Sequence, residues 1–209
     1  MERAGLAGMQ PLLLLVVGTP GSGKSFFARQ FADSYRFFYI DVGRYEGELE
    51  GLKSSNQEVT NLAKKIASGT FEHALKSFKH IILEGPFNSA REREEIVSRA
   101  AKAGFGTLVV WVQTDIETSA DRALNRDRRR ADDRSALSLS QTEFDKLVKT
   151  FQKPNPKKDI FVVISGKHDF KSQGVIVLKK IAAMYVNGAQ NSTDKPVKPS
   201  TPPIRPIIR

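Results

Sequence analysis

The eight residues from Gly18 to Ser25 read G-T-P-G-S-G-K-S and fit the pattern G-x-x-x-x-G-K-[ST]. Six apolar residues, Leu12 to Val17, come directly before them, and apolar residues at helical spacing follow directly after. An apolar run of this length is typical of a buried parallel strand, so the octet is predicted to join a strand to a helix. In that context a glycine-rich loop binds phosphate through its backbone N–H groups. We therefore expect a phosphate-binding loop.

Each fixed position of this loop has a physical reason. Glycines permit backbone dihedral angles that let successive N–H groups converge on phosphate oxygens. Lys24 is expected to reach the β- and γ-phosphates of ATP, and the Ser25 hydroxyl is expected to be a ligand for Mg²⁺. The residues predicted to hold the nucleotide are Gly18, Thr19, Pro20, Gly21, Ser22, Gly23, Lys24 and Ser25.

Two other interpretations of the octet are weaker. A glycine-rich turn that binds nothing would not need a strand before it and a helix after it. A dinucleotide-binding loop would need a third glycine three residues after Gly23, but Phe26 stands there.

The composition fits one domain and excludes several classes of site. With 209 residues and no cysteine, the chain has no disulfide, thiol nucleophile or cysteine zinc site. The long apolar run Leu12 to Val17 is too short to span a bilayer, and cleaving it as a signal peptide would destroy the loop. We expect a cytoplasmic protein without a membrane partner.

The net charge of +10 raises the question of nucleic acid. The tail after Gly188 holds +3 of it, which leaves +7 for a body whose expected ligand is a polyphosphate. Nucleic acid is therefore a partner that the charge permits but does not favour.

Apolar runs alternate with helical patterns along the chain. This alternation predicts an α/β fold: a single doubly wound, parallel five-stranded sheet with an arginine-rich lid. We expect a flexible leader over 1–10, the domain over 11–187 and a disordered tail rich in proline and lysine over 188–209. The expected strands are 12–17, 37–40, 81–83, 107–112 and 160–164, and the expected helices are 26–34, 57–67, 70–78, 89–104, 118–130, 140–151 and 175–186.

Ligands of such sheets lie at the carboxyl ends of the strands. The polar residues that follow the second, third and fourth strands are Asp41, Glu84 and the segment 113–115. An Asn-Lys-x-Asp segment that would read guanine is missing from the sequence, which excludes a typical GTPase. A ring-forming ATPase would need a longer domain and an Asp-Glu pair where Glu84-Gly85 stands. A small kinase remains, with its acceptor loop after the second strand and its lid after the fourth.

Three short motifs outside the loop carry a resemblance to a known family. They are Asp41-Val42-Gly43-Arg44, the segment from Glu84 to Asn88 followed by Arg91, and Leu124-Asn125-Arg126 followed by Arg130. From Leu12 to Val186 the chain resembles the P-loop kinases grouped with polynucleotide kinase and the zeta-toxin kinases, an AAA-type ATP-binding kinase domain. Gluconate, shikimate and adenylate kinases are more distant. Glu84 departs from this pattern, because the family usually has Asp there.

The resemblance implies a role for each matched residue. Asp41 would be the general base and would bind the acceptor together with Arg44 and Arg91. Glu84 would hold Mg²⁺ or its waters with Ser25. Lys24, Arg126 and Arg130 would stabilise the transition state.

The expected function is transfer of the ATP γ-phosphoryl group to a hydroxyl of a small molecule such as a nucleoside, sugar or nucleotide-sugar. Two alternatives stay open: a 5′-hydroxyl polynucleotide kinase, and an ATP-binding regulatory module without turnover.

Overall fold

The computed structural model describes residues 10–49, 56–77, 80–126 and 139–192. All strand pairs of its one sheet are parallel, and the spatial order of the strands is β2-β3-β1-β4-β5. This confirms the predicted α/β fold. The strands are β1 (Leu12–Val17), β2 (Phe38–Asp41), β3 (Ile81–Glu84), β4 (Gly106–Gln113) and β5 (Phe161–Ser165).

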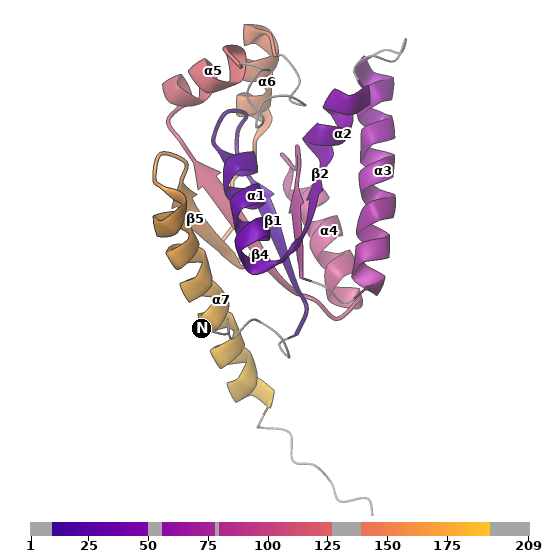
Figure 1. Cartoon of the computed structure of the whole chain (residues 1–209), viewed down its shortest axis with the longest axis vertical. Coiled ribbons are helices and arrows are strands. Elements are labelled where there is room, and N and C mark those ends of the chain that lie inside the picture. The colour runs from indigo at the N-terminus through magenta and orange to yellow at the C-terminus, as the bar shows by residue number, and fades with distance from the viewer. Residues whose placement is uncertain (1–9, 50–55, 78–79, 127–138, 193–209) are drawn as a thin grey trace, which may run out of the picture.

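Helices cover both faces of the sheet (Figure 1). Helices α1 (Lys24–Tyr35) and α7 (Phe170–Ser192) pack on one face, and α3 (Asn56–Lys76) and α4 (Ala90–Lys102) pack on the other. The central strand β1 is buried over its whole length because it has neighbours on both edges and helices on both faces. Its uniformly apolar sequence follows from this position.

Three short helices lie toward the carboxyl ends of the strands. Helix α2 (Val42–Leu49) follows β2 directly, and α5 (Ile116–Leu124) and α6 (Gln141–Thr150) lie together above the loop between β1 and α1 (Figure 1). A capping box of Ser89 and Glu92 begins α4, and a second one of Ser140 and Glu143 begins α6.

The structure corrects the prediction for the segment after β2. No helix is predicted between residues 40 and 57, yet α2 forms there and includes Gly43 and Gly47. The Asp41 carboxylate accepts a hydrogen bond from the backbone N–H of Arg44 at 3.1 Å, which satisfies a donor of the first helical turn. Burial of Val42 and Glu46 then holds one side of the helix against the domain.

Helix α3 is continuous where two helices were predicted. Gly69 lies between the two predicted helices, and a side chain at that position would meet no atom within 4 Å, so this glycine faces open space. The Thr70 hydroxyl donates to the carbonyl of Ile66 at 3.0 Å inside the continuous helix. The apolar face that carries Ala67 and Phe71 continues through this point and holds the helix together.

The remaining differences concern helix ends. Helix α7 begins at Phe170, five residues before the predicted start, and runs to Ser192. The helix predicted over 118–130 is observed as α5, from Ile116 to Leu124. Residues 127–138 lie outside the described part. Of the predicted leader only Gln10 lies within the described part, and of the predicted tail only residues 188–192, which belong to α7 and do not begin a disordered segment. Within the described ranges, every helix is too short or too polar to cross a membrane.

Candidate active site

The loop between β1 and α1 has the backbone conformation that phosphate binding requires. Gly21 and Gly23 have φ angles of 74° and 97°, in the left-handed region that favours glycine. Gly23 is also the N-cap of α1, so the positive end of this helix faces the loop.

The loop is held from behind by neighbouring segments. The Thr114 hydroxyl donates to the carbonyl of Ser22 at 3.0 Å. A Cβ atom at Gly21 would collide with the backbone carbonyl of Ser119 in α5, so only glycine fits there. A Cβ atom at Gly166, after β5, would likewise collide with the carbonyl of Ser22. Packed neighbours thus hold the loop without a ligand, and such pre-organisation reduces the entropic cost of binding.

Lys24 and Ser25 occupy the first turn of α1. The Lys24 ammonium donates to the carbonyl of Thr19 at 2.9 Å, which folds the side chain back over the loop. The Ser25 hydroxyl donates to Glu84 Oε1 at 2.7 Å. Two residues predicted as Mg²⁺ ligands, 59 positions apart in the chain, thus lie in direct contact.

Asp41 and Glu84 stand side by side because β2 and β3 pair in that register. Tyr39, two residues before Asp41, joins them. Its hydroxyl oxygen lies 2.6 Å from Glu84 Oε2 and 3.1 Å from Asp41 Oδ2. Sequence reasoning read Tyr39 only as a strand residue and missed this contact. The available signal was its spacing of two from Asp41, which places both side chains on the same face of β2.

Burial dominates the electrostatics of this cluster. The pKa of Glu84 is raised to about 7 by burial and by the neighbouring Asp41 carboxylate, against the lowering effect of Lys24. The pKa of Lys24 is lowered by burial and, further, by the charge of Arg126, while Glu84 and Asp41 raise it. Burial and the two carboxylates raise the pKa of Tyr39, so the phenol keeps its proton.

The arginines predicted to act in the site differ in how close they lie to the cluster around Lys24. Arg126 acts electrostatically on Lys24, so it belongs to the cluster. Arg44 is exposed and pairs with Glu48 at 2.7 Å. Arg91 is exposed in the first turn of α4. Arg130 lies outside the described residues.

Arg93, which sequence reasoning did not single out, is fully buried. Its guanidinium donates to the carbonyls of Phe87 and Asn88 at 3.2 and 3.4 Å and to that of Lys153 at 3.4 Å. It therefore ties the loop after β3 to the segment after α6. A fixed loop after β3 in turn fixes the end of the strand that carries Glu84.

The donor set fits Mg²⁺. Ser25 and Glu84 offer oxygen atoms, and Mg²⁺ prefers a few protein oxygens completed by waters and substrate phosphates. Within the described part of the chain, no group of three or more His, Cys, Asp or Glu side chains could hold a metal ion.

Solved structures share the whole fold. A candidate kinase from Chloroflexus aurantiacus is 18% identical, with a TM-score of 0.66 over 84% of this chain and 99% of that one. A gluconokinase from Sinorhizobium meliloti is 14% identical, with a TM-score of 0.60 over 87% of this chain and 98% of that one. These likenesses establish the fold.

Sequence comparison gives a shorter match. Adenylate kinase isoenzyme 5 from Bos taurus is 32% identical over 80 residues, which cover 37% of this chain. The match spans only 14% of that relative's length. The family model of the AAA domain matches residues 13–154. The chain therefore belongs to this AAA domain family, and its fold is that of the P-loop kinases.

Proposed function

We propose that the protein transfers the γ-phosphoryl group of ATP, with Mg²⁺, to a hydroxyl group of a small molecule such as a nucleoside, sugar or nucleotide-sugar. The observation that carries the proposal is the contact of Ser25 with Glu84 beside Asp41. Two candidate Mg²⁺ ligands and a candidate base thus lie together beside the glycine-rich loop, which supports the proposal.

The loop residues Gly18 to Ser25 bind the triphosphate through their backbone N–H groups, and Lys24 contacts the β- and γ-phosphates. Ser25 and Glu84 hold Mg²⁺ or its waters. A Mg²⁺ ion held there would supply positive charge that offsets the negative charge of the phosphates during transfer. Binding of a cation next to Glu84 favours the ionised form of its carboxyl group, which burial disfavours in the free protein.

Asp41 accepts or orients the proton of the acceptor hydroxyl. The acceptor oxygen forms a bond to the γ-phosphorus while the bond from that phosphorus to the β–γ bridging oxygen breaks, and ADP leaves. Arg44 and Arg91 bind other parts of the acceptor. To bind the acceptor, Arg44 must give up its exposed ion pair with Glu48. This costs little because exposed ion pairs are weak.

Arg126 and Arg130 supply positive charge to the transferring group. The electrostatic effect of Arg126 on Lys24 supports this role, since both cations would share the same phosphate oxygens. Catalysis then consists of positioning and charge neutralisation.

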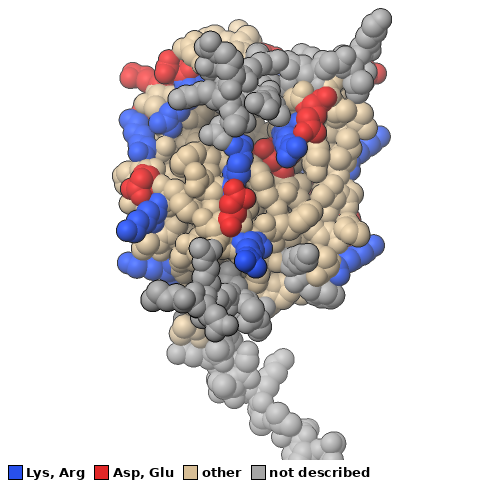
Figure 2. All heavy atoms as spheres, viewed as in Figure 1, with Lys and Arg blue, Asp and Glu red and all other residues tan. Residues whose placement is uncertain are grey.

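The charge distribution of the described residues on one face of the molecule supports a small acceptor over a nucleic acid. On the face seen in Figure 2, the described Lys and Arg side chains are interspersed with Asp and Glu. A nucleic-acid enzyme typically gathers its basic residues in a patch or stripe. The name of the gluconokinase among the similar structures also points to a small acceptor.

A screen of hydroxyl acceptors with labelled ATP tests the proposal. Nucleosides, sugars, nucleotide-sugars and 5′-hydroxyl oligonucleotides would be offered with Mg²⁺, and the Asp41→Asn variant would be the inactive control. Label transfer to a small acceptor is the expected result. Transfer to the oligonucleotides alone would establish the polynucleotide alternative. ATP binding without transfer to any acceptor would indicate a regulatory module.

A further inference from the structure

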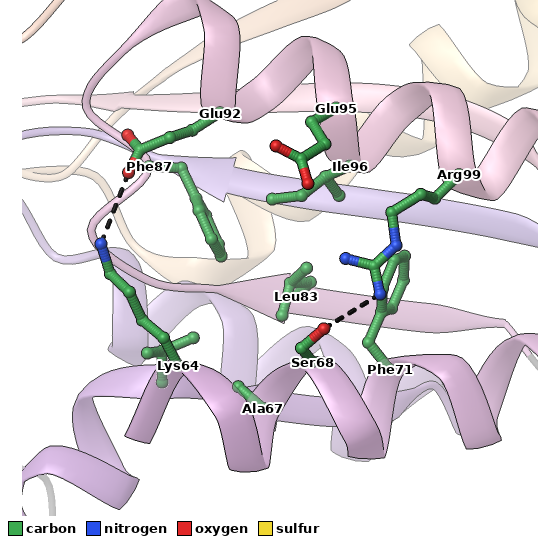
Figure 3. A pocket seen from close by; sticks show the side chains of 11 residues that line it. Lys64, Ala67, Ser68, Phe71, Leu83, Phe87, Glu92, Glu95, Ile96 and Arg99 are labelled. Atoms are coloured by element: carbon green, nitrogen blue, oxygen red, sulfur yellow. Dashed lines mark hydrogen bonds and ion pairs between the residues drawn. The ribbon is translucent and has the colours of Figure 1, made fainter. Parts of the chain in front are cut away.

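A cavity of about 200 Å³ lies between α3 and α4, on the sheet face opposite α1 (Figure 3). It is separate from the phosphate-binding loop, because the loop residues are absent from its lining. Its apolar wall is formed by Val42, Ala67, Phe71, Leu83, Phe87 and Ile96.

The size and lining of this cavity suit an organic ring. An apolar cavity of about 150 Å³ in another protein stays dry and binds benzene. The present cavity is larger, so it has room for a benzene-sized ring and a short arm. Apolar walls favour the ring by removing its surface from water.

Two polar contacts close the ends of the cavity. Lys64 of α3 pairs with Glu92 of α4 at 3.5 Å at one end. At the other end, Arg99 donates to the Ser68 hydroxyl at 3.0 Å and lies over the ring of Phe71, 5.3 Å from its centroid (Figure 3). Arg99 also pairs with Glu72 outside the lining. Lys64 and Arg99, the two cationic side chains at the ends of the cavity, thus already have acidic partners.

Glu95 lies between these two ends on the same side of α4, and its carboxylate reaches over the cavity in Figure 3. Among the residues that the structure describes, it makes no hydrogen bond or ion pair. Within the described part of the chain it is therefore the charged side chain of the lining that has no ion-pair partner. An anionic ligand would have to displace one of the ion pairs, whereas a cationic ligand would pair with a free carboxylate.

From this charge complementarity we infer a second ligand site, which takes a small organic ammonium compound with an aromatic or otherwise apolar body. The body occupies the space between Ala67 and Ile96, and the ammonium group pairs with Glu95. This site is additional to the proposed phosphoryl transfer and does not depend on it.

The wall of the cavity touches the strand ends that carry the catalytic candidates. Val42 and Leu83 line it, and they are the chain neighbours of Asp41 and Glu84. Because successive strand side chains point to opposite faces, Leu83 faces the cavity while Glu84 faces the loop side. A bound ligand therefore contacts residues that are next in the chain to both carboxylates, from the opposite face of the sheet.

Three probes of one shape test the site in the full chain: 2-phenylethylamine, the neutral 2-phenylethanol and the anionic 3-phenylpropionate. Methyl resonances in an NMR titration would locate binding and give the affinities. We expect the amine to bind tightest, the propionate weakest, and the shifts to centre on Ala67, Leu83 and Ile96. Probes that shift none of these resonances would overturn the site.

Matched variants test the assignment of charge. Glu95→Gln should weaken binding of the amine by about three- to tenfold and leave binding of the alcohol unchanged, because only the amine gains a charged partner. Glu94→Gln, at the adjacent exposed position outside the lining, should change neither. Equal effects of the two variants, or an amine that binds no tighter than the alcohol, would refute the ammonium assignment.

Filling the cavity gives an independent test. Ala67→Leu should abolish binding of both the amine and the alcohol. A cooperative thermal unfolding transition would show that the variant is folded. Ile96→Phe fills the same space from α4 and replaces Ala67→Leu if that variant does not fold. Undiminished binding to a folded, filled variant would place the probes elsewhere and overturn the proposal. ATP turnover plays no part in these measurements, so their failure would leave the proposed kinase function untouched.

Discussion

The Tyr39 hydroxyl lies 2.6 Å from Glu84 Oε2, and the same oxygen is 3.1 Å from Asp41 Oδ2. A phenol has one proton, so it donates to one carboxylate at a time and keeps both at fixed positions. Two neighbouring carboxylates repel each other when both are ionised. A shared donor between them offsets part of this repulsion and orders the pair before Mg²⁺ and acceptor bind.

Tyr39→Phe should therefore slow phosphoryl transfer while ATP still binds. A hydrogen bond to a charged group contributes about 1.5–3 kcal/mol, so we expect kcat to fall by roughly 10- to 100-fold. The Mg²⁺ concentration at half-maximal rate should rise, because Glu84 loses a partner that orients it. Tyr35→Phe, an exposed position on α1, is the control. Unchanged kcat and Mg²⁺ dependence would mean that the Tyr39 contact is only structural.

Asp41→Asn tests whether Asp41 is a base. ATP affinity should be kept, because this side chain does not grip the phosphates, and the transfer rate should fall by about 10²- to 10⁴-fold. Arg44→Ala should instead raise the acceptor KM with little change in kcat. Steady-state kinetics and calorimetric ATP titration separate the two effects, with exposed Asp33→Asn as the control. If Asp41→Asn abolished Mg²⁺ATP binding and Glu84→Gln did not, Asp41 would be chiefly a metal-water ligand.

Lys24→Ala should weaken ATP binding by about 10- to 100-fold, because a charge-assisted contact to the phosphates is lost. Calorimetric titration measures this directly. Lys65→Ala, on an exposed part of α3, should leave the affinity unchanged. Equal affinities of wild type and Lys24→Ala would overturn the assignment of the loop.

The sequence predicted the sheet and the loop well because both depend on local patterns. An apolar run such as Leu12–Val17 can only be buried, and the glycines of the octet have a fixed mechanical role. The pairing of β2 with β3 is different, since it depends on tertiary packing. The spacing of two places Tyr39 and Asp41 on one face of β2, but the position of Glu84 beside them follows from that pairing and has no local signature.

The helix errors also have tertiary causes. Gly69 weakens a helix by its own propensity, but the buried face around Phe71 holds α3 together across it. Arg93 illustrates the opposite case, in which a charged residue on a polar helix is drawn inside by three backbone carbonyls. Counting charges along α4 could not distinguish it from its exposed neighbour Arg91.

Arg93→Ala should destabilise the fold, whereas Arg91→Ala should not. Removing the buried guanidinium leaves carbonyls of two loops without donors, and we expect the free energy of unfolding to fall by about 2–4 kcal/mol. Arg91→Ala should change it by less than about 0.5 kcal/mol, because that side chain is exposed. Urea unfolding followed by circular dichroism measures both. Similar values for the two variants would contradict the role of Arg93 as a tie between loops.

The raised pKa of Glu84 predicts how stability of the nucleotide-free protein depends on pH. This pKa rises from 4.5 to about 7 on folding, so between these values the folded state binds more protons than the unfolded state. The contribution of Glu84 to stability is therefore fully present below about pH 4.5 and is lost as the pH rises through 7. Glu84→Gln removes this loss, and the variant should gain stability relative to wild type from pH 5 to pH 8, by on the order of 1–3 kcal/mol. Urea unfolding of both proteins in EDTA at each pH measures the difference, in which contributions of other groups such as Glu46 cancel. A difference that stays constant across this range would show that the Glu84 carboxyl group titrates near its ordinary pKa despite its burial.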